Sequence, residues 1–220
     1  MQHKLLTGSS LVIACIAAPI AAGASTVVDF TEAAKLNRDV ISTPTDTQGL
    51  TFSSPHYHLN DDASPSFGGN VTPLGYLYVD GPKFGSPVTV TQTGGGLFSL
   101  LQLDSSKLWG NSAAAAAENL DNAEFLHLVG HRAGGSTVTA DLALSFGFST
   151  YTLNGFSNLE SVLISGFVTN GTQDASWAID NIIYAPVPEA STIYLMLAGL
   201  GALTAVCRLR RQAGKASRKT

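Results

Sequence analysis

Two runs in the middle of the chain decide the fold: Phe125-Leu-His-Leu-Val-Gly-His131 and Ser136-Thr-Val-Thr-Ala-Asp-Leu-Ala-Leu144, with Gly134-Gly135 between them. Both runs alternate apolar and polar residues, which is the period of a half-buried β-strand, and a glycine pair is typical of a turn. Similar runs, rich in β-branched and aromatic residues, recur at residues 25–30, 87–91, 159–165 and 177–184. Short strands at this spacing predict an all-β protein.

Turn residues separate these runs, as at Asp80-Gly81-Pro82, Gly94-Gly95-Gly96 and Asn154-Gly155. We therefore expect residues 25–186 to form one antiparallel β-sandwich of the jelly-roll type. The run Thr26–Phe30 and the run Trp177–Tyr184 stand at the two ends of this region, where a jelly roll commonly pairs its first and last strands. No internal repeat divides the region.

The chain ends in an apolar run, Ile193 to Cys207, between Val187-Pro188-Glu189 and the basic residues Arg208, Arg210 and Arg211. This run predicts a transmembrane helix at residues 192–207, which Arg208 can extend by placing its charge at the membrane surface. The three arginines would act as a stop-transfer signal and keep residues 208–220 in the cytoplasm. A buried core helix is the alternative, but the run is apolar on every side.

The first residues are typical of a signal peptide. Lys4 provides a positive start, Leu11 to Ala22 an apolar stretch, and Ala22-Gly23-Ala24 a small-residue cleavage site. We expect a signal helix in residues 1–24 and cleavage after Ala24. A lipid anchor on Cys15 is the alternative, but the apolar stretch continues well past that cysteine.

Residues 187–211 resemble the PEP-CTERM sorting domain of Gram-negative bacteria. The features shared are Val187-Pro188-Glu189, the short apolar helix and the terminal arginines, although Ala190 stands where the motif has a second proline. The resemblance implies cleavage by an exosortase-class membrane protease. It also implies transient residence in the inner membrane and then delivery to the cell envelope, surface or extracellular matrix. Such proteins usually occur in bacteria that make exopolysaccharide and biofilm.

The region 25–186 is acidic, with 15 Asp and Glu against five Lys and Arg, a formal charge of −10. Nucleic-acid binding requires a basic face, so this charge excludes it. Cys15 and Cys207 both lie outside the region, which therefore has no disulfide. Its stability in an oxidising exterior must come from core packing or a bound metal ion.

A second resemblance is to galactose-binding-like jelly rolls. It rests on segments such as Phe98-Ser99-Leu100, Asn154-Gly155-Phe156 and Ala178-Ile179-Asp180-Asn181-Ile182. Modules of that type commonly hold a structural calcium ion where the first and last strands meet. The matching residues here are Glu32 and Asp180, and carboxylates suit calcium. The alternative is that Asp180 and Asn181 bond to neighbouring backbone.

Candidate sugar-stacking residues are Trp109 and Tyr57, which stand in loop-like sequences, while Tyr76 and Tyr78 fall on one side of a possible strand. The pairs His56 with His58 and His127 with His131 have the spacing that places two imidazoles on one side of a strand. Either pair suits zinc or copper, but no third ligand follows at a known spacing, so we interpret them as strand histidines.

The sequence has no nucleophile elbow and no phosphate-binding glycine loop. We expect a non-catalytic surface or matrix protein associated with exopolysaccharide. The alternative is a carbohydrate-binding module, and an enzyme that acts on polysaccharide is a distant third.

Overall fold

The computed structural model describes residues 23–32, 44–60, 75–79, 87–108, 122–168, 175–188, 196–201 and 204. Within these ranges the chain forms strands in the following order: β1 (Thr26–Val28), β2 (Thr45–Thr47), β3 (Leu50–Ser53), β4 (His58–Asn60), β5 (Tyr76–Val79), β6 (Val88–Gln92), β7 (Phe98–Lys107), β8 (Phe125–Arg132), β9 (Thr137–Ala143), β10 (Ser149–Thr152), β11 (Leu159–Phe167) and β12 (Trp177–Pro186).

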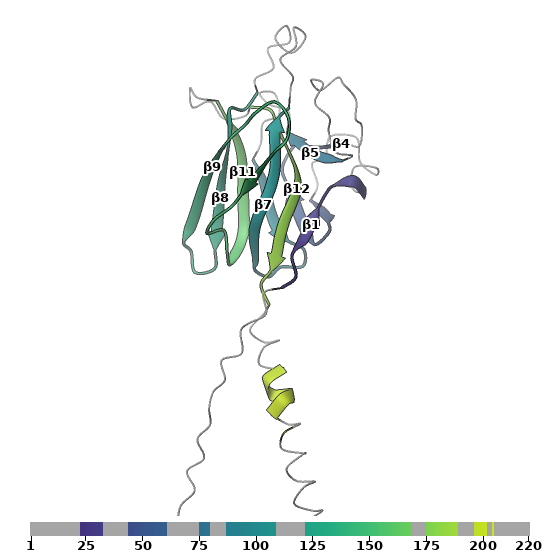
Figure 1. Cartoon of the computed structure of the whole chain (residues 1–220), viewed down its shortest axis with the longest axis vertical. Coiled ribbons are helices and arrows are strands. Elements are labelled where there is room, and N and C mark those ends of the chain that lie inside the picture. Colours follow the sequence, from purple (N-terminus) through teal and green to yellow (C-terminus); the bar gives the residue numbers. More distant parts are fainter. Residues whose placement is uncertain are drawn as a thin grey trace, which may run out of the picture.

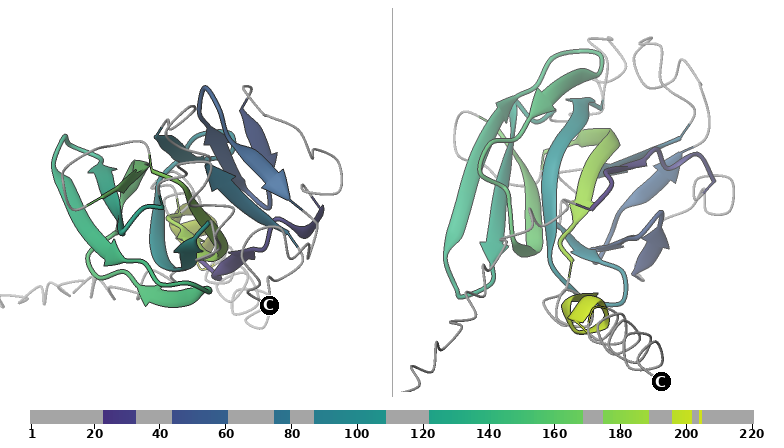
Figure 2. Two further views of the ribbon diagram at one scale, coloured as in Figure 1. Left: turned by 90° about the horizontal axis from the view of Figure 1, so that it is seen from above. Right: turned by 60° about the horizontal axis from the view of Figure 1, so that its bottom comes forward.

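The strands form two layers, which can be followed in Figures 1 and 2. One layer, which we call the β7/β12 sheet, has the order β10-β7-β12-β5-β4, with β1 beside the second half of β12. The other, the β8/β11 sheet, has the order β2-β3-β6-β11-β8-β9. Only the pair Leu159 and Phe98 connects β11 with β7. All these pairings are antiparallel, so the predicted antiparallel sandwich is confirmed.

The first and last strands pair, as the jelly-roll interpretation expects. Thr26 lies opposite Tyr184 and Val28 lies opposite Ile182. Because β5 pairs with the first half of β12 and β1 with the second half, the last strand lies in the middle of its sheet.

The core lies between the layers and follows the predicted period of two. In β8, Leu126 and Leu128 are fully buried while Phe125 and His127 face outward. Each apolar side chain removed from water stabilises the fold by roughly 25 cal/mol per Å². Gly166 of β11 shows how tight this packing is. A Cβ atom there would lie 2.7 Å from the Ala175 carbonyl oxygen and would also overlap the Trp177 ring.

The two terminal helices predicted from the sequence are not supported. Residues 1–22 of the predicted signal helix lie outside the described residues. Of the predicted transmembrane helix, the structure describes helical residues at 196–201 and at Thr204. Among the described parts of the chain, no helix has both the length and the apolar character needed to cross a membrane.

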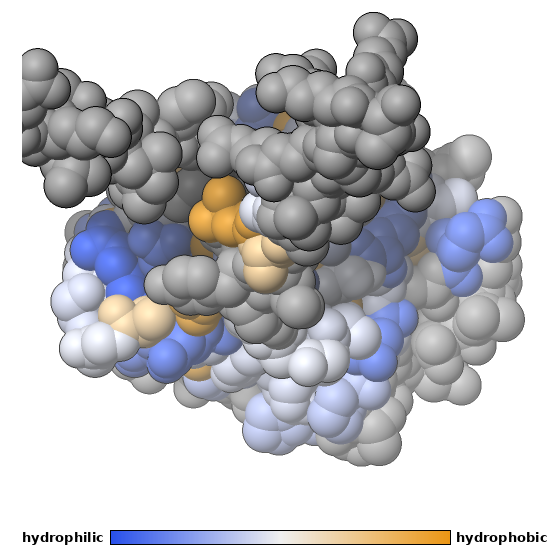
Figure 3. All heavy atoms as spheres, turned by 90° about the horizontal axis from the view of Figure 1, so that it is seen from below, coloured by the Kyte–Doolittle hydropathy of each residue, from blue (hydrophilic) through white to orange (hydrophobic). Residues whose placement is uncertain are grey.

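The described helical segment lies below the sandwich in Figure 1 and exposes apolar side chains, with Met196 72% exposed. Figure 3 shows the molecule from this end, with apolar residues visible in a small area near its centre and hydrophilic residues further out on either side. The basic tail with Arg208, Arg210 and Arg211 lies outside the described residues.

Candidate ligand-binding face

A continuous series of aromatic rings crosses one edge of the β7/β12 sheet. His58 of β4 stacks on Tyr78 of β5, with ring centroids 4.5 Å apart and planes at 7°. His56 contacts His58 edge-on at 5.2 Å. On the other side, Tyr76 lies 5.9 Å from Tyr78 and 6.0 Å from Phe148. We call these five residues the aromatic row.

The aromatic row lies on the outer face of its sheet. His58 and Tyr78 are directly opposite in the β4–β5 ladder, so their side chains share one face. Tyr76 and Tyr78 form a small cluster with Leu108, Ala178 and Phe148 that is separate from the main core. Tyr76 is only 1% exposed, whereas Tyr78, His58 and Phe148 are half-buried. The row thus presents ring surface while remaining fixed by packing.

A polar network lies on the same face. Asp104 of β7 accepts a hydrogen bond at Oδ1 from the Thr150 hydroxyl (2.6 Å) and another at Oδ2 from the Asn181 amide (2.9 Å). Thr150 is the ladder partner of Asp104 in β10, which explains the first contact. Asn181 reaches Asp104 because the β12 register shifts after Asp180 and Asn181 has a φ of 45°. Because of this bulge, Asn181 directs its side chain to Asp104, which is also the ladder partner of Asp180.

Asp180 is the most unusual polar residue of this face. Its side chain is fully buried, opposite Asp104 in the ladder, and among the described residues neither carboxylate oxygen has a hydrogen-bond partner. Burial raises the pKa of Asp180 to about 7; the nearby Asn181 backbone amide opposes the shift, and the charges of Asp104 and Asp29 add to it. A buried carboxylate without partners destabilises the fold unless it is protonated or binds a cation.

The sugar-stacking prediction for Tyr57 is wrong. Its ring is 0% exposed and belongs to the main core. Its hydroxyl donates to Thr45 Oγ1 at 2.5 Å, and burial raises its pKa. Tyr57 precedes His58 in an extended segment, so it points inward when His58 points outward. Trp109 lies outside the described residues.

The neighbouring aromatic predictions are confirmed in part. Tyr76 and Tyr78 do share one face. His56 and His58 contact each other, but as members of the aromatic row. Alternation placed the rings on one face; the sequence could not show that β4 and β5 pair and so join the histidines to the tyrosines.

The calcium prediction pairs a buried residue with an exposed one, because Glu32 is exposed and Asp180 is not. In the described part of the chain, no three His, Cys, Asp or Glu side chains gather as a metal-binding group. The two Asp180 carboxylate oxygens nevertheless suit a hard cation such as calcium, because they are buried and accept no hydrogen bond from the described residues. The Glu32–Asp180 site stays a prediction.

The two histidines of the second pair, His127 and His131, have different surroundings. His127 bonds to Asp141, and His131 is exposed further along β8. Within the described ranges, neither histidine pair has the third His, Cys, Asp or Glu that a zinc or copper site would need.

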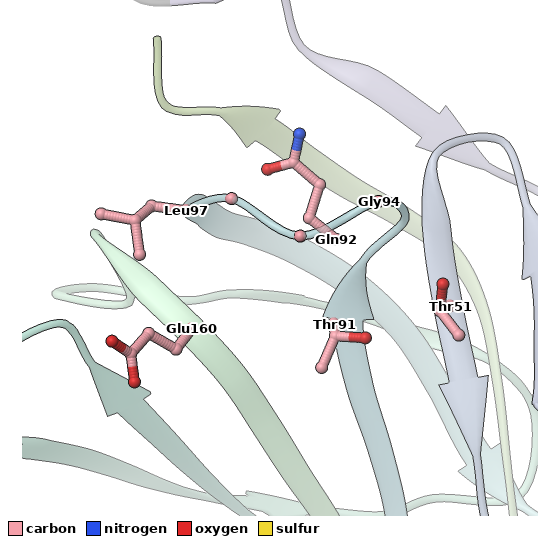
Figure 4. Close-up of a pocket in the computed structure, with 8 residues that line it drawn as sticks. Thr51, Thr91, Gln92, Gly94, Leu97 and Glu160 are labelled. Atoms are coloured by element: carbon pink, nitrogen blue, oxygen red, sulfur yellow. The ribbon is translucent and has the colours of Figure 1, made fainter. Parts of the chain in front are cut away.

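A hollow of about 560 Å³ lies at the β6–β7 turn (Figure 4). Its lining includes the turn Gly94–Gly96, Thr51, Thr91 and Glu160. Gly94 has a φ of 79°, which glycine adopts readily. Figure 4 shows Gln92 pointing away from Thr91 and Glu160, so these polar groups do not converge on one point.

The sorting segment begins where the sandwich ends. The Val187 backbone N–H donates to the Leu97 carbonyl oxygen at 2.8 Å, which ties the first residue of Val187-Pro188-Glu189 to the end of β12. Glu189 lies outside the described residues. A protease that recognises this segment would meet it directly after the last strand.

Comparison with known proteins agrees with this position. Residues 186–211 match the PEP-CTERM protein-sorting motif. The fold and this motif define an exported β-sandwich protein. More specifically, the chain carries the sorting signal of an exosortase substrate, which implies processing at the membrane and delivery to the cell envelope or surface.

A search of curated proteins finds no match. Two solved structures align with the chain at low identity. The enzymatically active domain of bacteriophage CBA120 tailspike protein 4 is 13% identical, with a TM-score of 0.33, over 63% of this chain and 19% of that one. CtCBM11 is 11% identical, with a TM-score of 0.37, over 78% of this chain and 100% of that one. At these scores the alignments give no information on function.

Proposed function

We propose that this chain is a non-catalytic protein of the cell envelope or extracellular matrix that binds exopolysaccharide through the outer face of the β7/β12 sheet. The observation that carries the proposal is the aromatic row beside the Asp104 network. A sugar ring has an apolar C–H face that packs on aromatic rings and hydroxyls that bond to carboxylates and amides. Ligand sites combine these features, a mostly apolar surface with a few placed polar groups.

The geometry favours binding over hydrolysis. Asp104 is held by Thr150 and Asn181, which stabilise it as an acceptor. Asp180 is buried beneath the same face rather than open to a substrate. A glycosidase requires two carboxyl groups that both reach the scissile bond, so we assign Asp104 to sugar hydroxyls and Asp180 to the fold.

We include calcium in the proposal, with Asp180 as the buried ligand and Glu32 as the exposed one. β1 pairs with β12, which brings the segment after Val28 toward Asp180, and Asp29 is close enough to influence the Asp180 pKa. A divalent cation would neutralise these carboxylates and join the first strand to the last. The ion would thus stabilise the sheet that bears the aromatic row.

Sorting completes the proposal. Val187, Pro188 and Glu189 are recognised by the exosortase, while Arg208, Arg210 and Arg211 hold the tail on the cytoplasmic side. Replacing the three arginines with Glu should misplace the tail and prevent processing. Normal processing and surface display of that variant would contradict this role.

Affinity electrophoresis tests the binding role. The full chain, purified in mild detergent, is run through gels that contain the polysaccharide secreted by the producing bacterium. We expect retardation that decreases in Tyr78→Leu, which keeps apolar volume but removes the planar ring. Phe146→Leu is the matched control, because Phe146 is an exposed ring outside the aromatic row. Trp109→Ala is run beside them to test the predicted stacking residue.

The other functions give different results. Absence of retardation would leave a structural role without sugar binding, and release of reducing sugar would indicate an enzyme.

A further inference from the structure

The opposite sheet has an aromatic pair of its own on its outer face. Phe125 of β8 and Phe167 of β11 are ladder partners, and their rings are parallel within 6° with centroids 6.3 Å apart. His127 meets Phe167 edge-on at 5.7 Å. These three residues line a hollow of about 210 Å³. Because Leu126, Leu128 and Ile164 point into the core, the three alternating residues must face outward.

A polar row borders this hollow. His127 lies between two ladder partners, Asp141 of β9 and Ser165 of β11. Its Nδ1 is 2.5 Å from Asp141 Oδ1. A carboxylate bound to one imidazole nitrogen fixes the ring and directs the other nitrogen toward a different partner. The side chains of His127 and Asp141 are 34% and 66% exposed, so both can reach a ligand.

The residues around this hollow indicate which kind of ligand fits it. The lining is apolar and aromatic, which suits one flat face of a small ring. The adjoining Asp141, His127 and Ser165 suit hydroxyl groups that donate and accept hydrogen bonds. A polyanion is disfavoured, because Asp141 is anionic and the exported region has a formal charge of −10. A neutral sugar ring has both required features.

We propose that Phe125, Phe167, His127 and Asp141 form a second binding site for a neutral sugar ring, on the opposite sheet from the aromatic row. This inference rests on the proposed polysaccharide-binding function. Two sites on opposite faces of one rigid sandwich cannot be filled by the same short stretch of polymer. The domain would therefore join two polysaccharide segments, and binding to a long polymer would gain from both contacts.

The test compares variants of the full chain in detergent, with the neutral fraction of the producing bacterium's secreted polysaccharide as probe. The double variant Phe125→Leu/Phe167→Leu keeps apolar volume but removes both flat rings, and Asp141→Asn removes the charge. Thr139→Ala is the matched control, since Thr139 is an exposed β9 residue outside the hollow. Thermal unfolding of each variant verifies that it is folded.

We expect the wild type to cross-link the polymer, measured as a rise in low-shear viscosity. The double variant should lose this rise, and its affinity for the polymer should decrease on the order of 100-fold because one of two linked contacts is gone. It should still be retarded in the gel through Tyr78. Asp141→Asn should weaken cross-linking, and Thr139→Ala should leave it unchanged.

Each contrary result has a separate meaning. Unchanged viscosity and affinity in the folded double variant would overturn the second site and leave the Tyr78 face intact. Lost binding in the double variant with normal binding in Tyr78→Leu would support this site but contradict the aromatic row. Self-association that the double variant abolishes, without any sugar binding, would overturn the inference in favour of a contact between copies. No retardation of the wild type would overturn both proposals.

Discussion

The two sides of β12 differ in how their residues are stabilised, although the residues alternate along one strand. On the inner side, Trp177, Ile179 and Ile182 pack in the main core. On the outer side, Ala178 covers part of the small aromatic cluster, and Asp180 is equally buried but has no hydrogen-bond partner among the described residues. The inner side therefore stabilises the fold, while the outer side includes a carboxylate that costs stability. This costly buried group on a ring-lined face is one of the observations that support the calcium proposal.

The largest expected effect is on the inner side. Ile179→Ala should lower the free energy of unfolding by about 2–5 kcal/mol, because it removes buried methyl groups and leaves a cavity. The loss should be the same at pH 5 and pH 8, since no charge is involved. Denaturant unfolding at both pH values measures it. A loss that varies strongly with pH would contradict the separation of the two sides.

The next effect is on the outer side and depends on pH. The folded-state pKa of Asp180, about 7, lies above the ordinary value of 3.8. Between these two pH values the native state keeps a proton on Asp180 that the unfolded state releases. The stability that the protonated Asp180 contributes is therefore fully present below about pH 4. It is lost as the pH rises toward 7.

Asp180→Asn should therefore be more stable than the wild type at pH 8 without calcium, and it should remove this pH dependence. The substitutions Asp104→Asn and Asp29→Asn, which each remove one neighbouring charge, should reduce the slope only partly. Parallel pH profiles of wild type and Asp180→Asn would contradict the assignment.

With calcium, the wild type should become more stable than Asp180→Asn. If Asp180 and Glu32 hold the ion, millimolar calcium should raise the melting temperature of the wild type by mass action. Asp180→Asn should lose this response, and Glu32→Gln should reduce it. Differential scanning calorimetry with calcium and with a chelator measures the shift. An identical wild-type melting temperature in both would exclude calcium from the account.

The smallest expected effect concerns the Asp104 network. Thr150→Val should lower the free energy of unfolding by about 1 kcal/mol, because it removes the hydrogen bond that Thr150 donates to the half-buried Asp104 carboxylate. Its affinity for the secreted polysaccharide should also decrease, because Asp104 would be less well oriented. Thr152→Val, two residues along the same strand, is the matched control. Equal effects of the two substitutions would show that the Asp104 contact has no special importance.

The fold could be predicted because period-two alternation determines which residues enter the core. The β8 segment demonstrates this, with Leu126 and Leu128 buried and His127 outside. The pairing of β1 with β12 followed from the jelly-roll interpretation. The two terminal helices are not supported: residues 1–22 lie outside the described residues, and of residues 192–207 the structure describes helical residues at 196–201 and at Thr204.

The candidate site was harder to predict because it depends on pairs between distant strands. Tyr57 was assigned to the surface, yet it points inward because alternation through β4 places His58 outside. The contact between His58 and Tyr78 requires the β4–β5 register, and the Asn181 contact with Asp104 requires a bulge in β12. Neither the register nor the bulge has a local signal in the sequence.

The most direct test of the central claim compares two tyrosines by titration calorimetry with the secreted polysaccharide. Tyr78→Leu removes a ring from the aromatic row, whereas Tyr57→Phe removes only a core hydroxyl. We predict that Tyr57→Phe binds as the wild type does and that Tyr78→Leu, while remaining folded, loses the part of the binding heat that comes from the aromatic row. Full binding by Tyr78→Leu would contradict a polysaccharide site on this face.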